Sequence, residues 1–329
     1  MIERASFLVL LAVALSAQAG EIDIDEWEVP YAESRPRDPF AESAESVWFV
    51  GQRTGYLARL DVERGRFEKI DLKPGSGPHN LIVGSDGIVW YAGNRNALIG
   101  RYDPATGEIE EIEMPDPAAR DPHTLVFDHD EENIWFTVQG GNRIGRLHID
   151  TREVDIAVSP TPRSRPYGIK IAPDGDVWAV LFGTHKLAHV DPATLELTEI
   201  ALPREKARPR RIEITSDGRV WYGDYATGRL GVYDPASGEF EEWPLPQGEG
   251  SRPYGMAADA QDRIWVVATG VQPNVFNGFD PQTASFFSAT PVPSGGGTVR
   301  HMHFHEPSGT VWFGTDTNYV GRARVTSDR

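Results

Sequence analysis

"GPHNLIVGSDGIVWYAG", residues 77–93, places an alternating apolar run behind Gly-Pro-His and ends in a Trp-Tyr pair after an Asp-Gly turn. Closely similar segments return as "RPYGIKIAPDGDVWAV" from Arg165 and "RPYGMAADAQDRIWVV" from Arg252. One such segment alone would indicate a β-hairpin, because Asp-Gly between two alternating runs favours a tight hairpin turn. Segments that recur at one period indicate a repeat architecture instead.

A tryptophan marks the second run of each repeat. The seven tryptophans are Trp48, Trp90, Trp135, Trp178, Trp221, Trp265 and Trp312. They are separated by 42, 45, 43, 43, 44 and 47 residues. A period in the forties with β patterning is typical of a propeller, in which each repeat forms one four-stranded sheet. We therefore predict an all-β protein that folds as a seven-bladed β-propeller.

The two ends of the chain complement each other. The segment "EIDIDEWEVP" at residues 21–30 matches the fourth strand of a repeat, such as "GEFEEWPLP" at residues 238–246. The last segment, residues 309–325, supplies only a second and a third strand. We expect the N-terminal strand to complete the last blade, which would protect the sheet edges and make residues 20–329 one domain.

Residues 1–19 predict a signal peptide. An early Arg4 precedes an apolar stretch from Phe7 to Leu15, and Ala17-Gln18-Ala19 forms a cleavage pattern of small residues. The stretch is short for a membrane span, and no later segment approaches 18 apolar residues. We therefore expect a periplasmic or secreted protein without a membrane span.

Composition excludes several classes of site and partner. The 329 residues include no cysteine, so disulfides, thiolate metal sites and a cysteine nucleophile are absent. The net charge of −17 disfavours nucleic acid and anionic membranes as partners. We expect a monomer that binds a small molecule or a peptide.

Each repeat carries a four-part pattern. Its parts are Pro-Tyr-Gly-Ile at 166–169, Asp-Gly-Ile-Val-Trp-Tyr at 86–91, Asn-Arg-Ile-Gly-Arg at 142–146 and Glu-Trp-Pro-Leu-Pro at 242–246. This pattern resembles that of the streptogramin B lyases, also called virginiamycin B lyases, over essentially the whole mature chain. The resemblance implies that the strand after the proline is the innermost strand of each blade.

The resemblance also implies an activity, that of a magnesium-dependent carbon–oxygen lyase that opens a macrocyclic ester by elimination. In such a reaction a general base removes an acidic Cα proton while the metal polarises the ester, so a histidine or carboxylate and oxygen ligands are required. In the family these groups come from two adjacent blades. One blade supplies a Pro-His, and the next supplies a Glu-Pro-His and a Glu just after the Trp strand.

One position at the start of the first run recurs in every repeat, 11 residues before the tryptophan in six repeats and 12 in the third, and it follows a proline in the first six repeats. These seven residues are Arg37, His79, His123, Tyr167, Arg210, Tyr254 and His301. If their strand is innermost, they crowd the mouth of the central channel, and we expect a ligand to bind there. Two arginines suit a ligand with a carbonyl or carboxylate group. The alternative is that the arginines and tyrosines cap strand ends and pair with the acidic surface.

Two histidines of this set match the family's Pro-His sites best. "GPH" ends at His79 and "DPH" ends at His123 in the next repeat, with Asp121 where the family has Glu. Gln139 stands where the family has a Glu after the Trp strand; its carbonyl can ligate Mg²⁺, but it cannot act as a base. We expect His79 and His123 to be catalytic, His123 to transfer the proton, and Asp121 and Gln139 to help hold magnesium. The alternative is two rim histidines that are hydrogen-bonded to their neighbours.

The seventh repeat contains a rival histidine cluster. His301, His303 and His305 alternate, so on a strand they point to one side. The last two replace aliphatic residues of the other repeats, such as Leu81 and Val83. Buried histidines need partners, and either a transition metal or a satisfied hydrogen-bonded pair would supply them.

Three functions therefore stay open: a metal-assisted lyase, a non-catalytic propeller that binds a ligand or a partner protein at the channel mouth, and a lactonase-like hydrolase. The hydrolase would need a channel cage of Glu, Asn and Asp, which these repeats do not supply. Whether carboxylates converge with His79 and His123 separates the first two functions.

Overall fold

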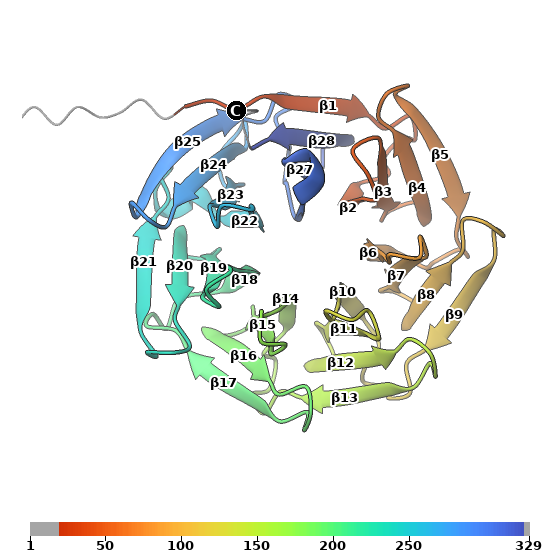
Figure 1. Ribbon diagram of the computed structural model, residues 1–329, viewed down its shortest axis with the longest axis horizontal. Coiled ribbons are helices and arrows are strands. Elements are labelled where there is room, and N and C mark those ends of the chain that lie inside the picture. Colours follow the sequence, from red (N-terminus) through yellow and green to blue (C-terminus); the bar gives the residue numbers. More distant parts are fainter. Residues whose placement is uncertain (1–19, 326–329) are drawn as a thin grey trace, which may run out of the picture.

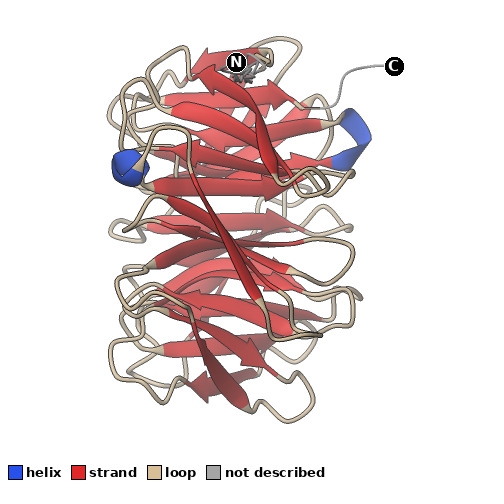
Figure 2. Ribbon diagram, turned by 90° about the vertical axis from the view of Figure 1, so that its left-hand side faces the viewer, coloured by secondary structure: helices blue, strands red, loops and turns tan. Residues whose placement is uncertain are grey.

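The computed structural model describes residues 20–325. Within them, seven four-stranded antiparallel sheets stand around a central channel (Figure 1). Nearly all of the regular secondary structure is strand, and the only helical elements described are two short 3₁₀ turns, at Glu249–Ser251 and Glu306–Ser308 (Figure 2). The predicted all-β, seven-bladed propeller is confirmed. The predicted signal peptide, residues 1–19, lies outside the described residues.

The first three blades follow one another along the chain, each numbered from its inner to its outer strand. Blade 1 contains β2 (Pro36–Ala41), β3 (Ser46–Gly51), β4 (Tyr56–Asp61) and β5 (Arg66–Asp71). Blade 2 contains β6 (Pro78–Val83), β7 (Val89–Gly93), β8 (Leu98–Tyr102) and β9 (Ile109–Glu113). Blade 3 contains β10 (Pro122–Phe127), β11 (Asn133–Val138), β12 (Arg143–His148) and β13 (Val154–Val158).

The next three blades repeat the same order. Blade 4 contains β14 (Pro166–Ile171), β15 (Val177–Leu181), β16 (Lys186–Val190) and β17 (Leu197–Ala201). Blade 5 contains β18 (Pro209–Ile214), β19 (Val220–Asp224), β20 (Arg229–Tyr233) and β21 (Phe240–Pro244). Blade 6 contains β22 (Pro253–Ala258), β23 (Ile264–Ala268), β24 (Val275–Asp280) and β25 (Ser285–Pro291).

Both ends of the chain build blade 7, as predicted. Its strands are β26 (Met302–His305), β27 (Thr310–Gly314), β28 (Tyr319–Arg324) and, outermost, β1 (Ile24–Glu28). Strand β1 is antiparallel to β28 and pairs Trp27 with Val320 (Figure 1). The Trp27 ring stacks on Trp312, with centroids 5.6 Å apart. This strand is shorter than the predicted 21–30 segment, but it closes the ring, so the last sheet has no unpaired edge at β28.

The repeated tryptophans fill the space between the sheets. Six of them are at most 2% exposed, namely Trp48, Trp90, Trp135, Trp221, Trp265 and Trp312. The second strand of each blade is buried almost end to end because it has a neighbouring blade on both faces, as in β7 and β23. The Asp-Gly turns before these strands take the predicted form, with φ of 78° at Gly87 and 94° at Gly175.

A β-bulge interrupts the inner strand of blades 1 to 6 just after its proline. In blade 2, for example, Pro78 pairs with Gly93 but Leu81 pairs with Tyr91. An advance of three residues along β6 therefore matches an advance of only two residues along β7. A bulge bends the strand and re-aims side chains. Consecutive residues such as His79 and Asn80 are therefore both buried against neighbouring inner strands instead of alternating between the two faces of the sheet.

Among residues 20–325, no helix is long and apolar enough to cross a membrane.

Candidate functional site

The predicted ring residues gather at one end of the channel, where the inner strands begin. Five of them are 1–5% exposed, namely Arg37, His79, His123, Tyr167 and Tyr254. Arg210 and His301 are half-buried. The channel mouth is therefore closed by packed side chains, and we call these seven residues the plug.

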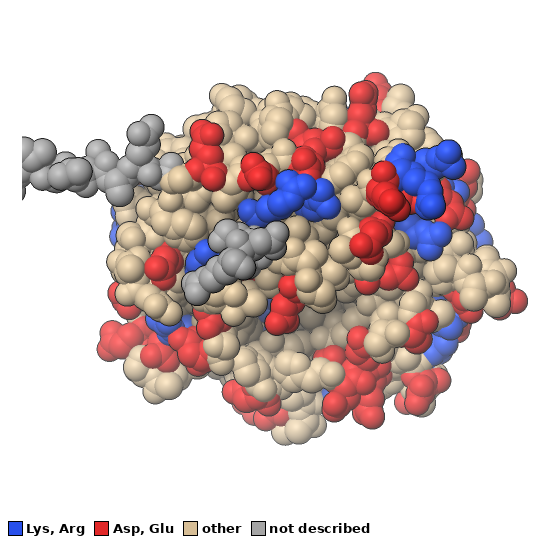
Figure 3. Space-filling model, turned by 45° about the horizontal axis from the view of Figure 1, so that its top comes forward, with Lys and Arg blue, Asp and Glu red and all other residues tan. Residues whose placement is uncertain are grey.

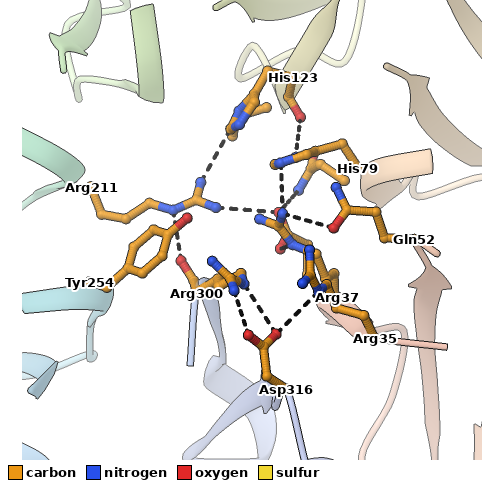
Figure 4. A network of polar contacts seen from close by, with 12 residues as sticks. Arg35, Arg37, Gln52, His79, His123, Arg211, Tyr254, Arg300 and Asp316 are labelled. Carbon is orange, nitrogen blue, oxygen red and sulfur yellow. Dashed lines mark hydrogen bonds and ion pairs between the residues drawn. The ribbon is translucent and has the colours of Figure 1, made fainter. Parts of the chain in front are cut away.

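Arg37 and His79 form the first contact of the plug. Nη1 of Arg37 lies 2.7 Å from Nε2 of His79 (Figure 4). A guanidinium can only donate, so Nε2 of His79 accepts and the histidine carries its proton on Nδ1. That Nδ1 lies 3.2 Å from the backbone carbonyl oxygen of His123, to which it donates. Both ring nitrogens of His79 are thus engaged.

His123 lies between His79 and Tyr167. The ring centroids of the two histidines are 3.6 Å apart, and those of His123 and Tyr167 are 4.0 Å apart. Nδ1 of His123 lies 2.9 Å from the Thr124 hydroxyl. Burial, reinforced by the nearby guanidinium groups of Arg37 and Arg211, holds the pKa of both histidines well below its usual value. Both imidazoles are therefore neutral at neutral pH.

Tyr167 and Tyr254 form the opposite side of the plug. Their hydroxyl groups share a hydrogen bond. The guanidinium of Arg210 lies 3.8 Å from the ring centroid of Tyr254 and 5.2 Å from that of Tyr167. Burial alone would raise the pKa of Tyr167, but the charges of Arg210, Arg37 and Arg211 outweigh it and lower that pKa to about 7. Burial and the neighbouring Tyr167 raise the pKa of Tyr254.

A second layer of polar residues lies directly behind the plug and comes from the bulges. Asp38 is 1% exposed; its carboxylate accepts from Nε of Arg37 at 3.3 Å and from Nη2 of Arg211 at 3.4 Å. It also accepts from the Asn80 amide at 3.1 Å. Burial opposes ionisation of Asp38, but these guanidinium groups prevail and hold its pKa far below the usual range. Nη1 of Arg211 also donates to the Thr124 hydroxyl, at 3.2 Å.

Asp121 and Gln139, the predicted metal ligands, lie at the outer rim of blade 3. The Asp121 carboxylate accepts backbone N–H groups from Gly140 at 2.5 Å and Gly141 at 3.1 Å, in the turn between β11 and β12. Burial raises its pKa. Gln139 is half-buried in the same turn. The Asp121 carboxylate is therefore held by this turn.

Magnesium does not fit the predicted donor set. The ion prefers an octahedron of oxygen ligands that includes carboxylates. Here the Asp121 carboxylate is used by backbone amides, and two guanidinium groups, of Arg37 and Arg211, lie against the histidines. No three His, Asp or Glu residues between positions 20 and 325 gather as metal ligands would.

His303 and His305 lie on β26, directly after the plug residue His301. The ring of His303 stacks on Phe40 with centroids 4.1 Å apart, and burial lowers its pKa to about 3. Nδ1 of His305 lies 2.7 Å from the Ser308 hydroxyl. Nδ1 of His301 is buried without a partner. His301 and His303 border a cavity of about 250 Å³, together with Asn80, Thr124 and Lys170. A larger hollow of about 620 Å³ lies outside the channel, beside β1 and β28.

Sequence reasoning missed most of the charged groups in this network. They are Arg35, Asp38, Arg211, Arg300 and Asp316 (Figure 4). Asp38 and Arg211 directly follow plug residues, and strict strand alternation would have turned them to the other side. The sequence did contain one signal for Asp38 and Arg211. Each is a charged residue on a strand that is expected to be buried on both faces, and such a residue needs a buried partner.

The fold and the plug define a β-propeller with a closed, arginine-rich channel mouth. The chain belongs to the virginiamycin B lyase family, whose model matches residues 12–272. A solved streptogramin B lyase is 23% identical with a TM-score of 0.81, over 92% of this chain and 97% of that one. The virginiamycin B lyase of Staphylococcus aureus is 22% identical with a TM-score of 0.82, over 92% of this chain and 99% of that one.

A catalytically inactive histidine-to-alanine variant of the Staphylococcus aureus enzyme, solved with quinupristin, is 22% identical with a TM-score of 0.83, over the same shares of the two chains. At these identities the likeness to solved structures establishes the fold alone. No curated protein matches the sequence. The match to the family model ends before β24, so the plug residues of blade 7 lie outside it.

Proposed function

We propose that this propeller binds a small polar molecule at the plug. The observation that carries the proposal is the seven-residue ring itself, in which two arginines, two tyrosines and three histidines from seven different blades meet at one end of the channel. Buried polar groups are costly unless they have a use, and convergent polar groups at a channel mouth are typical of a ligand site.

A ligand screen by thermal shift tests this proposal. The panel contains small acids, neutral esters and amides, and quinupristin, the molecule present with the inactive family variant. We expect at least one class to raise the melting temperature, and Arg210→Ala to weaken its binding by about 1 to 3 kcal/mol if the contact is charge-assisted. Arg146→Ala, which removes an arginine on an outer strand of blade 3, is the matched control. Binding that is insensitive to every plug variant would contradict the proposal.

The second candidate is a carbon–oxygen lyase that acts on an ester or depsipeptide. The observation that favours it is the contact between His79 and His123 across two neighbouring blades, with both imidazoles held neutral. Since both nitrogens of His79 are hydrogen-bonded, His123 is the better base and His79 the positioning residue.

Elimination needs no water. His123 takes the Cα proton, the C–H electrons form the new double bond, and the bond from the β-carbon to the ester oxygen breaks, so that a carboxylate leaves. Negative charge that develops on the substrate carbonyl oxygen would be stabilised by the guanidinium groups of Arg37 and Arg211.

Mass spectrometry in oxygen-labelled water tests the lyase candidate with quinupristin or another cyclic depsipeptide. We expect an unsaturated product without label, and a loss of about 100-fold or more in rate for His123→Ala. Incorporated label would indicate hydrolysis. Unchanged turnover in both His79→Ala and His123→Ala would remove this site and leave a binding role.

We also propose export to the periplasm or the medium, which rests on the leader at residues 1–19. Cell fractionation tests it, with a form that starts at residue 20 as the control. Retention of the complete chain in the cytoplasm would contradict it.

A further inference from the structure

The polar network at the channel mouth contains more positive than negative charge. Five arginines meet two carboxylates there. They are Arg35, Arg37, Arg210, Arg211 and Arg300, with Asp38 and Asp316. Asp38 forms ion pairs with Arg37 and Arg211. Asp316 forms ion pairs with Arg300 and, at 3.5 Å, with Arg35 (Figure 4).

Other groups nearby do not balance this excess. Asp121 precedes β10 and Asp224 ends β19, both at the same rim. Their carboxylates accept backbone N–H groups of adjacent turns. The three histidines that face the network are held neutral, which adds no charge of either sign. This excess of positive charge belongs to the channel mouth and not to the outer surface. On the face seen in Figure 3, acidic side chains are spread widely and basic side chains form only small groups.

Two of the arginines also have donors without acceptors. Arg37 is 5% exposed, and its Nη2 is buried with no hydrogen-bond partner. Nε of Arg210 is likewise buried and unpartnered, and its guanidinium is packed against aromatic rings, including Tyr225 at 4.4 Å and Phe182 at 4.6 Å. An unpaired buried charge costs several kcal/mol, so an arrangement like this is expected to have an anionic occupant.

We propose that the plug is an oxyanion site, in which a carboxylate or phosphate group of the ligand is held by Arg37, Arg210 and Arg211 beside the hydroxyl pair of Tyr167 and Tyr254. The inference rests on the proposed binding function and names the chemistry of the ligand. Guanidinium groups suit such oxyanions because they offer parallel N–H donors in one plane.

The tyrosine pair explains how the empty site is stabilised. Without an occupant, the phenol of Tyr167 can supply the missing negative charge, because the guanidinium groups around it lower its pKa. Arg37 faces it from blade 1, His123 from blade 3, Arg210 and Arg211 from blade 5, and Tyr254 from blade 6. An oxyanion that binds here takes over that role, so Tyr167 regains its proton. Binding should therefore take up a proton and raise the pKa of Tyr167.

The first experiment uses the unmodified protein. Tyrosinate is followed by ultraviolet absorbance as the pH is raised, without anion, with acetate and with inorganic phosphate. We expect one tyrosine to ionise early without anion and later with it, and this early step to be missing in Tyr167→Phe. Acetate and phosphate distinguish a carboxylate from a phosphate ligand. No early tyrosine and no effect of either anion would overturn the proposal.

Calorimetry with the same two anions locates the site. Arg37→Gln and Arg211→Gln should each weaken binding about 10- to 100-fold, the range expected for a hydrogen bond between charged groups, and Arg146→Gln should not. Undiminished binding in both Arg37→Gln and Arg211→Gln would overturn the proposal. If a plug variant does not fold, the absorbance titration of the unmodified protein still decides.

Failure of the oxyanion assignment can be distinguished from failure of the proposed binding function. If neutral esters or amides bind in a plug-dependent manner while acetate and phosphate do not, the ligand site stands and the oxyanion assignment falls. If no molecule of either kind binds, both fall.

Discussion

The hydroxyl groups of Tyr167 and Tyr254 share a hydrogen bond although these residues belong to blades 4 and 6, which are not neighbours. Arg210 of blade 5, the blade between them, covers both rings. Three blades are thus linked by one contact inside the channel. The energy of this contact depends on protonation, because the pKa of Tyr167 is lowered and that of Tyr254 is raised.

Replacing Tyr167 by phenylalanine should change how stability depends on pH. The folded pKa of Tyr167 is lowered from the unfolded value of about 10, so the folded state gains stability as the pH rises through the folded pKa towards 10. That contribution is lost as the pH falls through the folded pKa. The difference in unfolding free energy between the two proteins should therefore grow with pH, by up to about 1.4 kcal/mol per unit.

Urea denaturation between neutral and mildly alkaline pH measures this difference. Tyr319→Phe, in the third strand of blade 7, is the control. A difference that does not vary with pH would show that the arginines leave Tyr167 protonated.

Asp38→Asn should be strongly destabilising. It removes the carboxylate shared by Arg37 and Arg211, and breaking a buried ion pair costs about 3 to 5 kcal/mol. Because the folded pKa of Asp38 is depressed, its contribution is present above the unfolded pKa and is lost as the pH falls through the folded one. Denaturation at neutral and acidic pH should therefore show a difference that shrinks in acid. Asp61→Asn, on the exposed Asp61–Arg64 pair, should change stability little at either pH.

The neutral histidines should make the protein sensitive to mild acid. The pKa values of His79, His123, His301 and His303 are all lowered by burial, so below the unfolded value of about 6.5 the unfolded chain binds protons that the folded chain refuses. Stability should fall as the pH drops from about 7 to 5. His79→Gln should reduce that slope by about 1.4 kcal/mol per unit. An equal reduction in His148→Gln, on an outer strand, would argue against burial as the cause.

Removal of the closing strand should unfold or strongly destabilise the ring. A form that lacks residues 20–31 loses the pairing of β1 with β28 and the Trp27–Trp312 stack. It also leaves the Asn318 amide without the carbonyl oxygens of Val29 and Tyr31, which lie 2.9 and 3.0 Å away. We expect a loss of several kcal/mol or more, read as a lower melting temperature than that of a form lacking only residues 1–19. Equal melting temperatures would contradict the closure.

The sequence by itself determined the architecture. The tryptophan period and the alternating runs are local signals that recur in seven repeats, and an Asp-Gly turn precedes the tryptophan strand in three of them, so the repeat pattern is unambiguous. The strand that closes the ring was also predictable, because "EIDIDEWEVP" has the composition of an outer strand and the last repeat lacks one. The same alignment of the repeats also predicted the seven plug residues, one at the equivalent position of each blade.

Only the tertiary structure decided what these seven residues do. The bulges in the inner strands of blades 1 and 5 turn Asp38 and Arg211 to the channel as well, so these two residues join the network against strict strand alternation. Asp121 matched a motif position, yet its carboxylate is bound by the turn at Gly140 and Gly141. Charge balance and protonation depend on distances between blades that are far apart in the chain, and no local pattern encodes those distances.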